Sequence, residues 1–101
     1  MSYPLDARAD ARADALLIAE DYDAIRPDLA QRFRQQLKDV FETIKQRPTS
    51  YPVALKSKQV RRVLMDDFPY AVYFQFDGSA SLIFAVVHTA RRRSAWRKRL
   101  D

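Results

Sequence analysis

The chain has 101 residues, 48% hydrophobic and 31% charged, so residues 1–101 are expected to form one folded domain rather than a disordered segment. It has no apolar run long enough to cross a membrane, no secretion leader is expected at its N-terminus, and the absence of cysteine excludes disulfides and fits a reducing cytoplasm. One histidine and one glycine exclude most zinc sites and glycine-rich phosphate loops, so neither a metal nor a cofactor is expected.

The net charge of +5 is unevenly distributed along the chain. Residues 1–28 hold seven acidic and three basic side chains, whereas residues 29–65 hold nine basic and two acidic ones. Six further basic side chains fall between residues 91 and 99. A basic half with a basic tail indicates a polyanion or an acidic protein as partner, and the alternative is a plain solvated surface.

The first half of the chain is predicted to form a helical hairpin. Residues 6–15 repeat Asp-Ala-Arg-Ala, a tract compatible with a helix. One helical stripe then follows at Ala11, Ala15, Ile18, Tyr22 and Ile25. Pro27 ends this helix and suits the first turn of the next one, which stops before Pro48. The second helix has its apolar stripe at Leu29, Phe33, Leu37, Val40, Phe41 and Ile44.

The second half is predicted to form strands over residues 59–65, 70–76 and 81–88. Turns at residues 66–67 and 77–79 join them into an antiparallel meander. Residues 1–5 can add an edge strand, where Pro4 is tolerated. Residues 94–100 can add one or two helical turns. Because helices precede strands in separate blocks, the fold class is α+β.

The densest polar cluster begins where the most apolar strand ends. It opens with His88, the one side chain whose ordinary pKa lies near neutrality. The cluster continues through Arg91, Arg92, Arg93, Trp96, Arg97, Lys98 and Arg99. Arginine binds two phosphate oxygens at once, and tryptophan stacks on bases. The alternative is a solvated tail, with Trp96 packed on the core and His88 in a structural hydrogen bond.

A second basic cluster lies on the first predicted strand. Arg61 and Arg62 are adjacent, so they point to opposite faces, and one of the two is expected to be structural. Lys56 and Lys58 precede them in a loop, where they can reach phosphate or remain ordinary surface lysines.

The order of these features resembles the RelE/ParE superfamily of type II toxin–antitoxin toxins over nearly the whole chain. The matching segments are Ala13–Leu17 with Tyr22, Leu29–Phe33, Ile44–Pro52, Val60–Leu64, Phe68–Phe74, and Val86–His88 with Arg91–Arg93 and Trp96–Arg97. The resemblance implies a helical hairpin packed on a twisted antiparallel sheet of three to four strands, with a short C-terminal helical tail. It also implies a cognate antitoxin, a small acidic protein with a helical tail, and self-association when that partner is absent.

The resemblance implies one of two toxic activities. A RelE-like toxin is a ribosome-dependent, metal-independent mRNA endonuclease, and the basic tail favours this interpretation. Its catalytic residues here are His88, Arg61, Arg62 and Arg91. Its RNA-binding residues are Lys56, Lys58, Arg92, Arg93, Trp96, Arg97, Lys98 and Arg99. A ParE-like toxin instead inhibits DNA gyrase without a nuclease site. A third hypothesis is a non-toxic basic interaction module.

Overall fold

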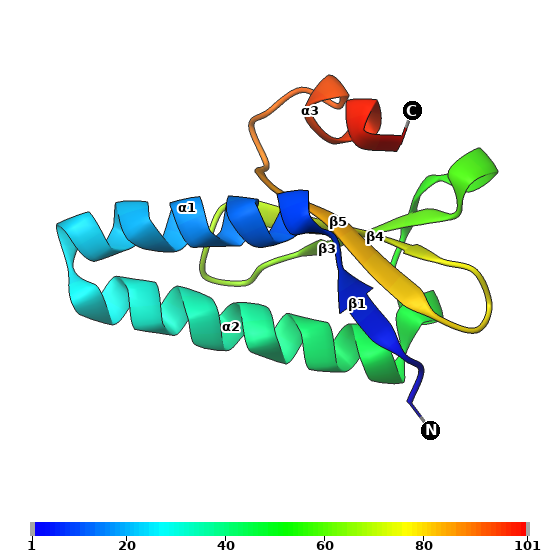
Figure 1. Cartoon of the computed structure of the whole chain (residues 1–101), viewed down its shortest axis with the longest axis horizontal. Helices are drawn as coiled ribbons and strands as arrows, with labels where there is room; N and C mark the ends of the chain where they lie inside the picture. The colour runs from blue at the N-terminus through cyan, green and yellow to red at the C-terminus, as the bar shows by residue number, and fades with distance from the viewer. Residues whose placement is uncertain (1, 101) are drawn as a thin grey trace.

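The computed structural model describes residues 2–100 and has two long helices, a five-stranded sheet and a short C-terminal helix (Figure 1). This arrangement confirms the predicted α+β class. The elements are β1 (Leu5–Ala7), α1 (Ala9–Ile25), α2 (Pro27–Gln46), β2 (Val53–Leu55), β3 (Val60–Leu64), β4 (Tyr70–Phe76), β5 (Ser81–His88) and α3 (Ser94–Arg97). Single 3₁₀ turns lie at residues 48–50, 56–58 and 98–100.

The helical hairpin forms as the proline and the apolar spacing predict. Arg26 is extended between the helices, and Pro27 and Asp28 occupy the first turn of α2, where a carboxylate is stabilised by the helix dipole. Phe33 lies on the buried stripe of α2. Ile25 departs from the prediction, since its side chain is 70% exposed. The reason is that the turn between α1 and α2 extends past the end of the sheet (Figure 1).

The sheet has the strand order β1-β5-β4-β3-β2. The three central strands form the predicted antiparallel meander, and β4 and β5 have the predicted bounds. The expectation of three to four antiparallel strands is corrected to a mixed sheet of five, because β1 pairs with β5 in parallel. The edge strand lies at residues 5–7 rather than 1–5, with Met1 outside the described residues. One more short strand, β2, follows the loop from Pro48 to Pro52 and pairs with the first predicted strand, β3.

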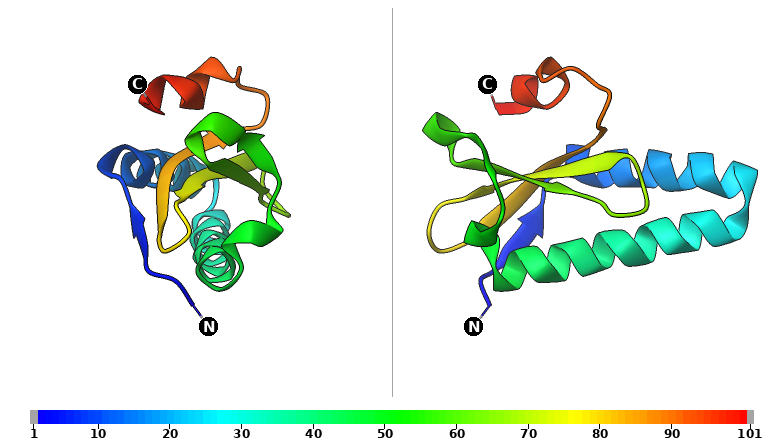
Figure 2. Two further views of the ribbon diagram at one scale, coloured as in Figure 1. Left: turned by 90° about the vertical axis from the view of Figure 1, so that its right-hand side faces the viewer. Right: turned by 180° about the vertical axis from the view of Figure 1, so that it is seen from behind.

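Both faces of the sheet are covered by apolar contacts. The hairpin packs on one face against Val72, Phe74 and Ile83. On the other face, α3 brings Trp96 onto Tyr73 and its neighbours, so the sheet lies between the hairpin and the C-terminal segment (Figure 2). Within residues 2–100, no helix has the length and apolarity needed to span a membrane.

Candidate functional site

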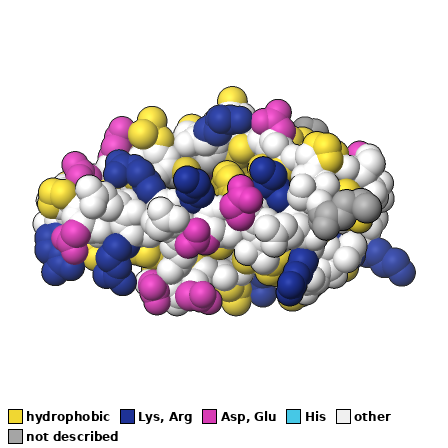
Figure 3. Space-filling model, turned by 90° about the horizontal axis from the view of Figure 1, so that it is seen from below, with side chains coloured by type: hydrophobic (Ala, Val, Ile, Leu, Met, Phe, Trp, Pro, Cys, Tyr) yellow, Lys and Arg dark blue, Asp and Glu magenta, His cyan; other side chains and the backbone are white. Residues whose placement is uncertain are grey.

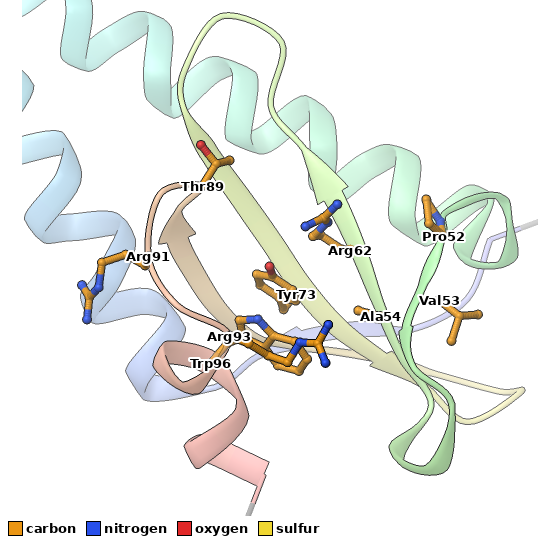
Figure 4. A pocket seen from close by; sticks show the side chains of 9 residues that line it. All are labelled: Pro52, Val53, Ala54, Arg62, Tyr73, Thr89, Arg91, Arg93 and Trp96. Atoms are coloured by element: carbon orange, nitrogen blue, oxygen red, sulfur yellow. The ribbon is translucent and has the colours of Figure 1, made fainter.

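An open, polar pocket of about 300 Å³ lies between β2 and the C-terminal segment, on the sheet face away from the helical hairpin (Figure 4). The segment from Pro52 to Ala54 lines one side of the pocket, the segment after β5 lines the other, and β3 and β4 lie at its base. The lining residues are Pro52, Val53, Ala54, Arg62, Tyr73, Thr89, Arg91, Arg93 and Trp96. The pocket lining therefore includes three arginines and two residues with hydroxyl groups, from β3, β4 and the segment after β5, and the side chain of Arg91 extends away toward α1 (Figure 4).

Strand register decides which of the two adjacent arginines reaches this pocket. Arg62 of β3 pairs with Tyr73 of β4, and both contribute to the pocket lining. Arg61 lies on the other side of the strand, where its guanidinium donates to the carbonyl oxygens of Thr49 at 3.3 Å and Tyr51 at 2.7 Å. Arg61 thus holds the loop before β2, and Arg62 is the arginine that can meet a ligand.

Trp96 lines the pocket as a buried side chain and not as an exposed ring free to stack on a ligand. Its ring stacks on Tyr73 with centroids 4.5 Å apart, and its side chain is only 4% exposed. Tyr73 thus covers one face of the ring, an arrangement that agrees with the alternative in which Trp96 packs on the core rather than on RNA bases. The stack also fixes α3 on the sheet and so places Arg93, just before α3, at the pocket.

The arginines of the pocket carry uncompensated positive charge. Among residues 2–100, no carboxylate forms an ion pair with Arg62, Arg91 or Arg93. The face seen from below differs, since basic and acidic side chains are interspersed there (Figure 3). A guanidinium without an internal carboxylate is a binding group for an external anion, so this pocket is the strongest candidate site of the described chain.

His88, at the end of β5, does not line this pocket. Its ring packs edge-on against Tyr70 with centroids 5.3 Å apart, and its Nδ1 accepts a hydrogen bond from the backbone N–H of Ala90 at 3.0 Å. It borders a separate hollow of about 230 Å³ against α1, which includes Leu17. Arg91 borders both hollows. The predicted catalytic set is therefore divided: Arg62 and Arg91 line the pocket, whereas Arg61 and His88 do not.

Tyr70 is the tyrosine whose ring packs against His88. Burial, and then the charges of Tyr22 and Asp21, raise the pKa of the Tyr70 hydroxyl above its ordinary value. Tyr70 therefore stays protonated near neutral pH and serves as a hydrogen-bond donor rather than as a base.

Arg99, one of the predicted RNA contacts, is engaged inside the protein. Its guanidinium donates to both carboxylate oxygens of Asp14, at 2.6 and 2.8 Å, and to the carbonyl oxygen of Phe84 at 3.0 Å. The hydrogen bond to Asp14 raises the pKa of Arg99 further above its ordinary range. The sequence predicts Arg99 as an RNA contact, whereas in the structure its guanidinium is occupied by these internal partners.

The remaining predicted contacts stay on the surface. Lys56, Lys58, Arg92, Arg97 and Lys98 are exposed. The lysines flank the turn between β2 and β3, and Arg97 and Lys98 border a shallow hollow beside α3.

The two pocket residues that carry hydroxyl groups, Tyr73 and Thr89, are not among the site residues predicted from the sequence. Tyr73 had a usable signal, because the alternation of two paired strands puts it on one face with Arg62. No sequence pattern points to Thr89, because it lies in the turn after β5, where strand alternation no longer applies. Among residues 2–100, His, Asp and Glu side chains form no cluster of three that can hold a metal ion.

Comparison with known proteins adds evidence on the fold. No protein-family model matches the sequence, and no curated protein matches it either. A chain of the solved structure titled "Chromosomal ParDE TA system from P. aeruginosa" matches with a TM-score of 0.75 and 18% identity, covering 86% of this chain and 96% of that chain. This likeness confirms the overall fold that the resemblance to RelE/ParE toxins implies.

Proposed function

We propose that this protein is the toxin component of a type II toxin–antitoxin system, acting in the cytoplasm and held inactive by a cognate antitoxin. Two independent observations support the proposal. The sequence has the RelE/ParE-like order of features, and the fold is similar to that of a chain from a ParDE toxin–antitoxin system. The antitoxin is expected to be acidic, since the toxin carries a net charge of +5.

We infer further that the toxin acts on DNA gyrase, as ParE-like toxins do, rather than by cutting mRNA. The observation that carries this inference is the separation of His88 from Arg62. Metal-independent RNA cleavage requires a group that removes the proton of the attacking 2′-hydroxyl. Within the described chain, the arginine pocket is lined by no histidine and no carboxylate. The pocket thus has the groups for binding an anion and lacks an ordinary general base.

The mRNA endonuclease is the second candidate, and the same pocket supports it in one respect. Guanidinium groups that converge on one place can bind a scissile phosphate and stabilise the charge that develops during cleavage. In this case Arg62 and Arg93 would hold the phosphate, and the Tyr73 hydroxyl would be the proton-transfer group nearest to them.

Induction of the protein from a tightly controlled promoter tests these alternatives. Gyrase inhibition predicts intact transcripts, altered plasmid supercoiling and trapped gyrase–DNA breaks, with Arg62→Ala relieving the growth arrest. New 5′ ends within translated mRNA, absent in Arg62→Ala, would assign the nuclease instead. Arg34→Ala is the matched control, because it removes the same charge from an exposed site on α2. Folded protein without a growth defect would leave the non-toxic interaction module.

A further inference from the structure

We propose that the arginine pocket binds the phosphodiester backbone of a polynucleotide directly, through phosphate groups and without reading bases. The inference rests on the proposed function in one respect: for a gyrase inhibitor, the polynucleotide is the duplex DNA held by the enzyme. The toxin then contacts the DNA of the target complex as well as its protein.

The placement of the arginines suits a phosphate. Arg62 and Arg93 flank Tyr73, while Arg91 extends toward α1 (Figure 4). Arg62 stands on a central part of the sheet, and Arg93 is held by the α3 segment whose Trp96 is buried. A phosphate between two guanidinium groups receives donors from both sides, and Thr89 lines the same pocket.

Further exposed cations lie on the two elements next to the pocket, the turn after β2 and the helix α3. Lys56 and Lys58 are exposed at the turn that carries β2 into β3. Arg97 and Lys98 are exposed on the far side, beside Arg93. An arginine pocket with further cations on both neighbouring elements matches a chain of several phosphates better than it matches one small anion.

The buried aromatic stack removes base recognition from this site. Proteins that read single-stranded bases present an exposed aromatic ring for stacking. The only aromatic side chains lining the pocket in the described chain are Tyr73 and Trp96, which stack on each other and are 6% and 4% exposed. Binding is therefore expected to be independent of base sequence and strongly dependent on salt.

Fluorescence anisotropy with the purified toxin tests the inference directly. The probes are a labelled duplex DNA and a single-stranded RNA of the same sequence, each titrated at several salt concentrations. The double variant Arg62→Ala, Arg93→Ala is expected to lower the affinity for DNA at least about tenfold. It is also expected to reduce the slope of log affinity against log salt concentration by about 2, since each lost phosphate contact removes about 1. Thermal melting confirms that each variant is folded.

The double variant Arg34→Ala, Lys38→Ala is the matched control, because it removes the same number of positive charges from exposed positions on α2 that do not line the pocket. It is expected to change affinity less than about twofold and the slope by less than about 1. An equal loss in the control and the pocket variant would assign binding to diffuse charge and overturn the proposal. Displacement of the DNA by polyglutamate at equal charge would also overturn it, by assigning the pocket to acidic proteins.

The outcomes separate this inference from the proposed function. A toxin that traps gyrase on DNA but has no measurable affinity for duplex DNA would overturn the inference and leave the function standing. A protein that binds DNA through the pocket but is harmless on induction would overturn the proposed function and leave the phosphate site standing. Tight binding of RNA with weak binding of DNA would support the phosphate site and move the target to RNA.

Discussion

Asp14 and Arg99 form an ion pair that hydrogen-bonds the backbone of β5 beyond the point where β1 ends. Strand β1 pairs with β5 only from Ser81 to Ile83. Beyond that point the Asp14 carboxylate accepts the backbone N–H of Val86 at 2.9 Å, and Arg99 donates to a β5 carbonyl oxygen while it pairs with Asp14. The charged tract at the start of the chain thus anchors the C-terminal tail that carries the pocket arginines.

Removal of Asp14 is predicted to destabilise the protein. Asp14→Ala leaves the Val86 N–H and the Arg99 guanidinium without their partner, at a cost of about 2–3 kcal/mol. Urea unfolding measures this difference. The control is Asp6→Ala, which breaks an ion pair with Arg12 whose side chains are 77% and 66% exposed and costs less than about 1 kcal/mol. Equal effects of the two substitutions would contradict the anchoring role of Asp14.

The indole ring of Trp96 is predicted to be shielded from water. As the only tryptophan of the chain, it reports the packing of α3 without interference. Its emission is expected at short wavelength with little quenching by iodide. Trp96→Ala is expected to cost about 3 kcal/mol, because it opens a cavity beside Tyr73 and releases α3. Emission typical of a water-exposed indole, with free access to iodide, would refute the packing of α3 on the sheet.

Substitution of the two adjacent arginines is predicted to separate stability from function. Arg61→Ala removes two hydrogen bonds to the loop before β2 and is expected to cost about 1–2 kcal/mol. Arg62→Ala is expected to change stability by less than about 0.5 kcal/mol, since it is an exposed substitution, while relieving the growth arrest. Thermal melts and growth after induction measure both effects. The assignment of Arg62 to the site fails if Arg61→Ala relieves the arrest with no loss of stability.

These two arginines also mark the limit of what the sequence predicts. Strand alternation assigns Arg61 and Arg62 to opposite faces, but which face meets the ligand depends on where the hairpin and α3 pack. The bounds of β4 and β5 are predictable because alternating apolar residues end at a turn with Asp77 and Gly78. Strands β1 and β2 have three residues each, too few for a pattern, and β1 pairs with a strand distant in sequence.

The internal role of Arg99 is beyond prediction from the sequence for the same reason, and the packing of Trp96 on the core follows from the sequence only as an alternative. Basic and aromatic residues in a tail have the composition of a nucleic-acid contact, and their partners are far away along the chain. Arg99 and Asp14 are separated by 85 positions. The Asp-Ala-Arg-Ala repeat reads as a helical tract, yet Asp10 and Asp14 in it both pair with Arg99. Local patterns therefore predict the elements, and packing decides which charges remain for a ligand.

The turn between β4 and β5 is predicted to make stability depend on acid pH. The Asp77 carboxylate accepts hydrogen bonds from the backbone N–H groups of Ser79 at 2.8 Å and Ala80 at 2.9 Å, and from the Ser79 hydroxyl. These bonds, led by the one from the Ser79 backbone, hold the pKa of Asp77 below its ordinary value of 3.8. Because folding favours the ionised form, this stabilisation is complete above the ordinary pKa and is lost as the pH falls through the lowered one.

Asp77→Asn keeps an acceptor oxygen in the turn and removes the charge, so it isolates the titrating contribution. Its melting temperature is expected to lie below that of the parent at neutral pH and to converge with it as the pH falls below 3.8. Ser79→Ala removes one hydrogen-bond donor to Asp77, so in this background the difference in melting temperature caused by Asp77→Asn is expected to be smaller. Carboxyl chemical shifts followed by NMR provide the direct check. A midpoint for Asp77 at or above 3.8, or a gap that stays constant with pH, would show that the turn is held by backbone geometry at Gly78 rather than by the charge.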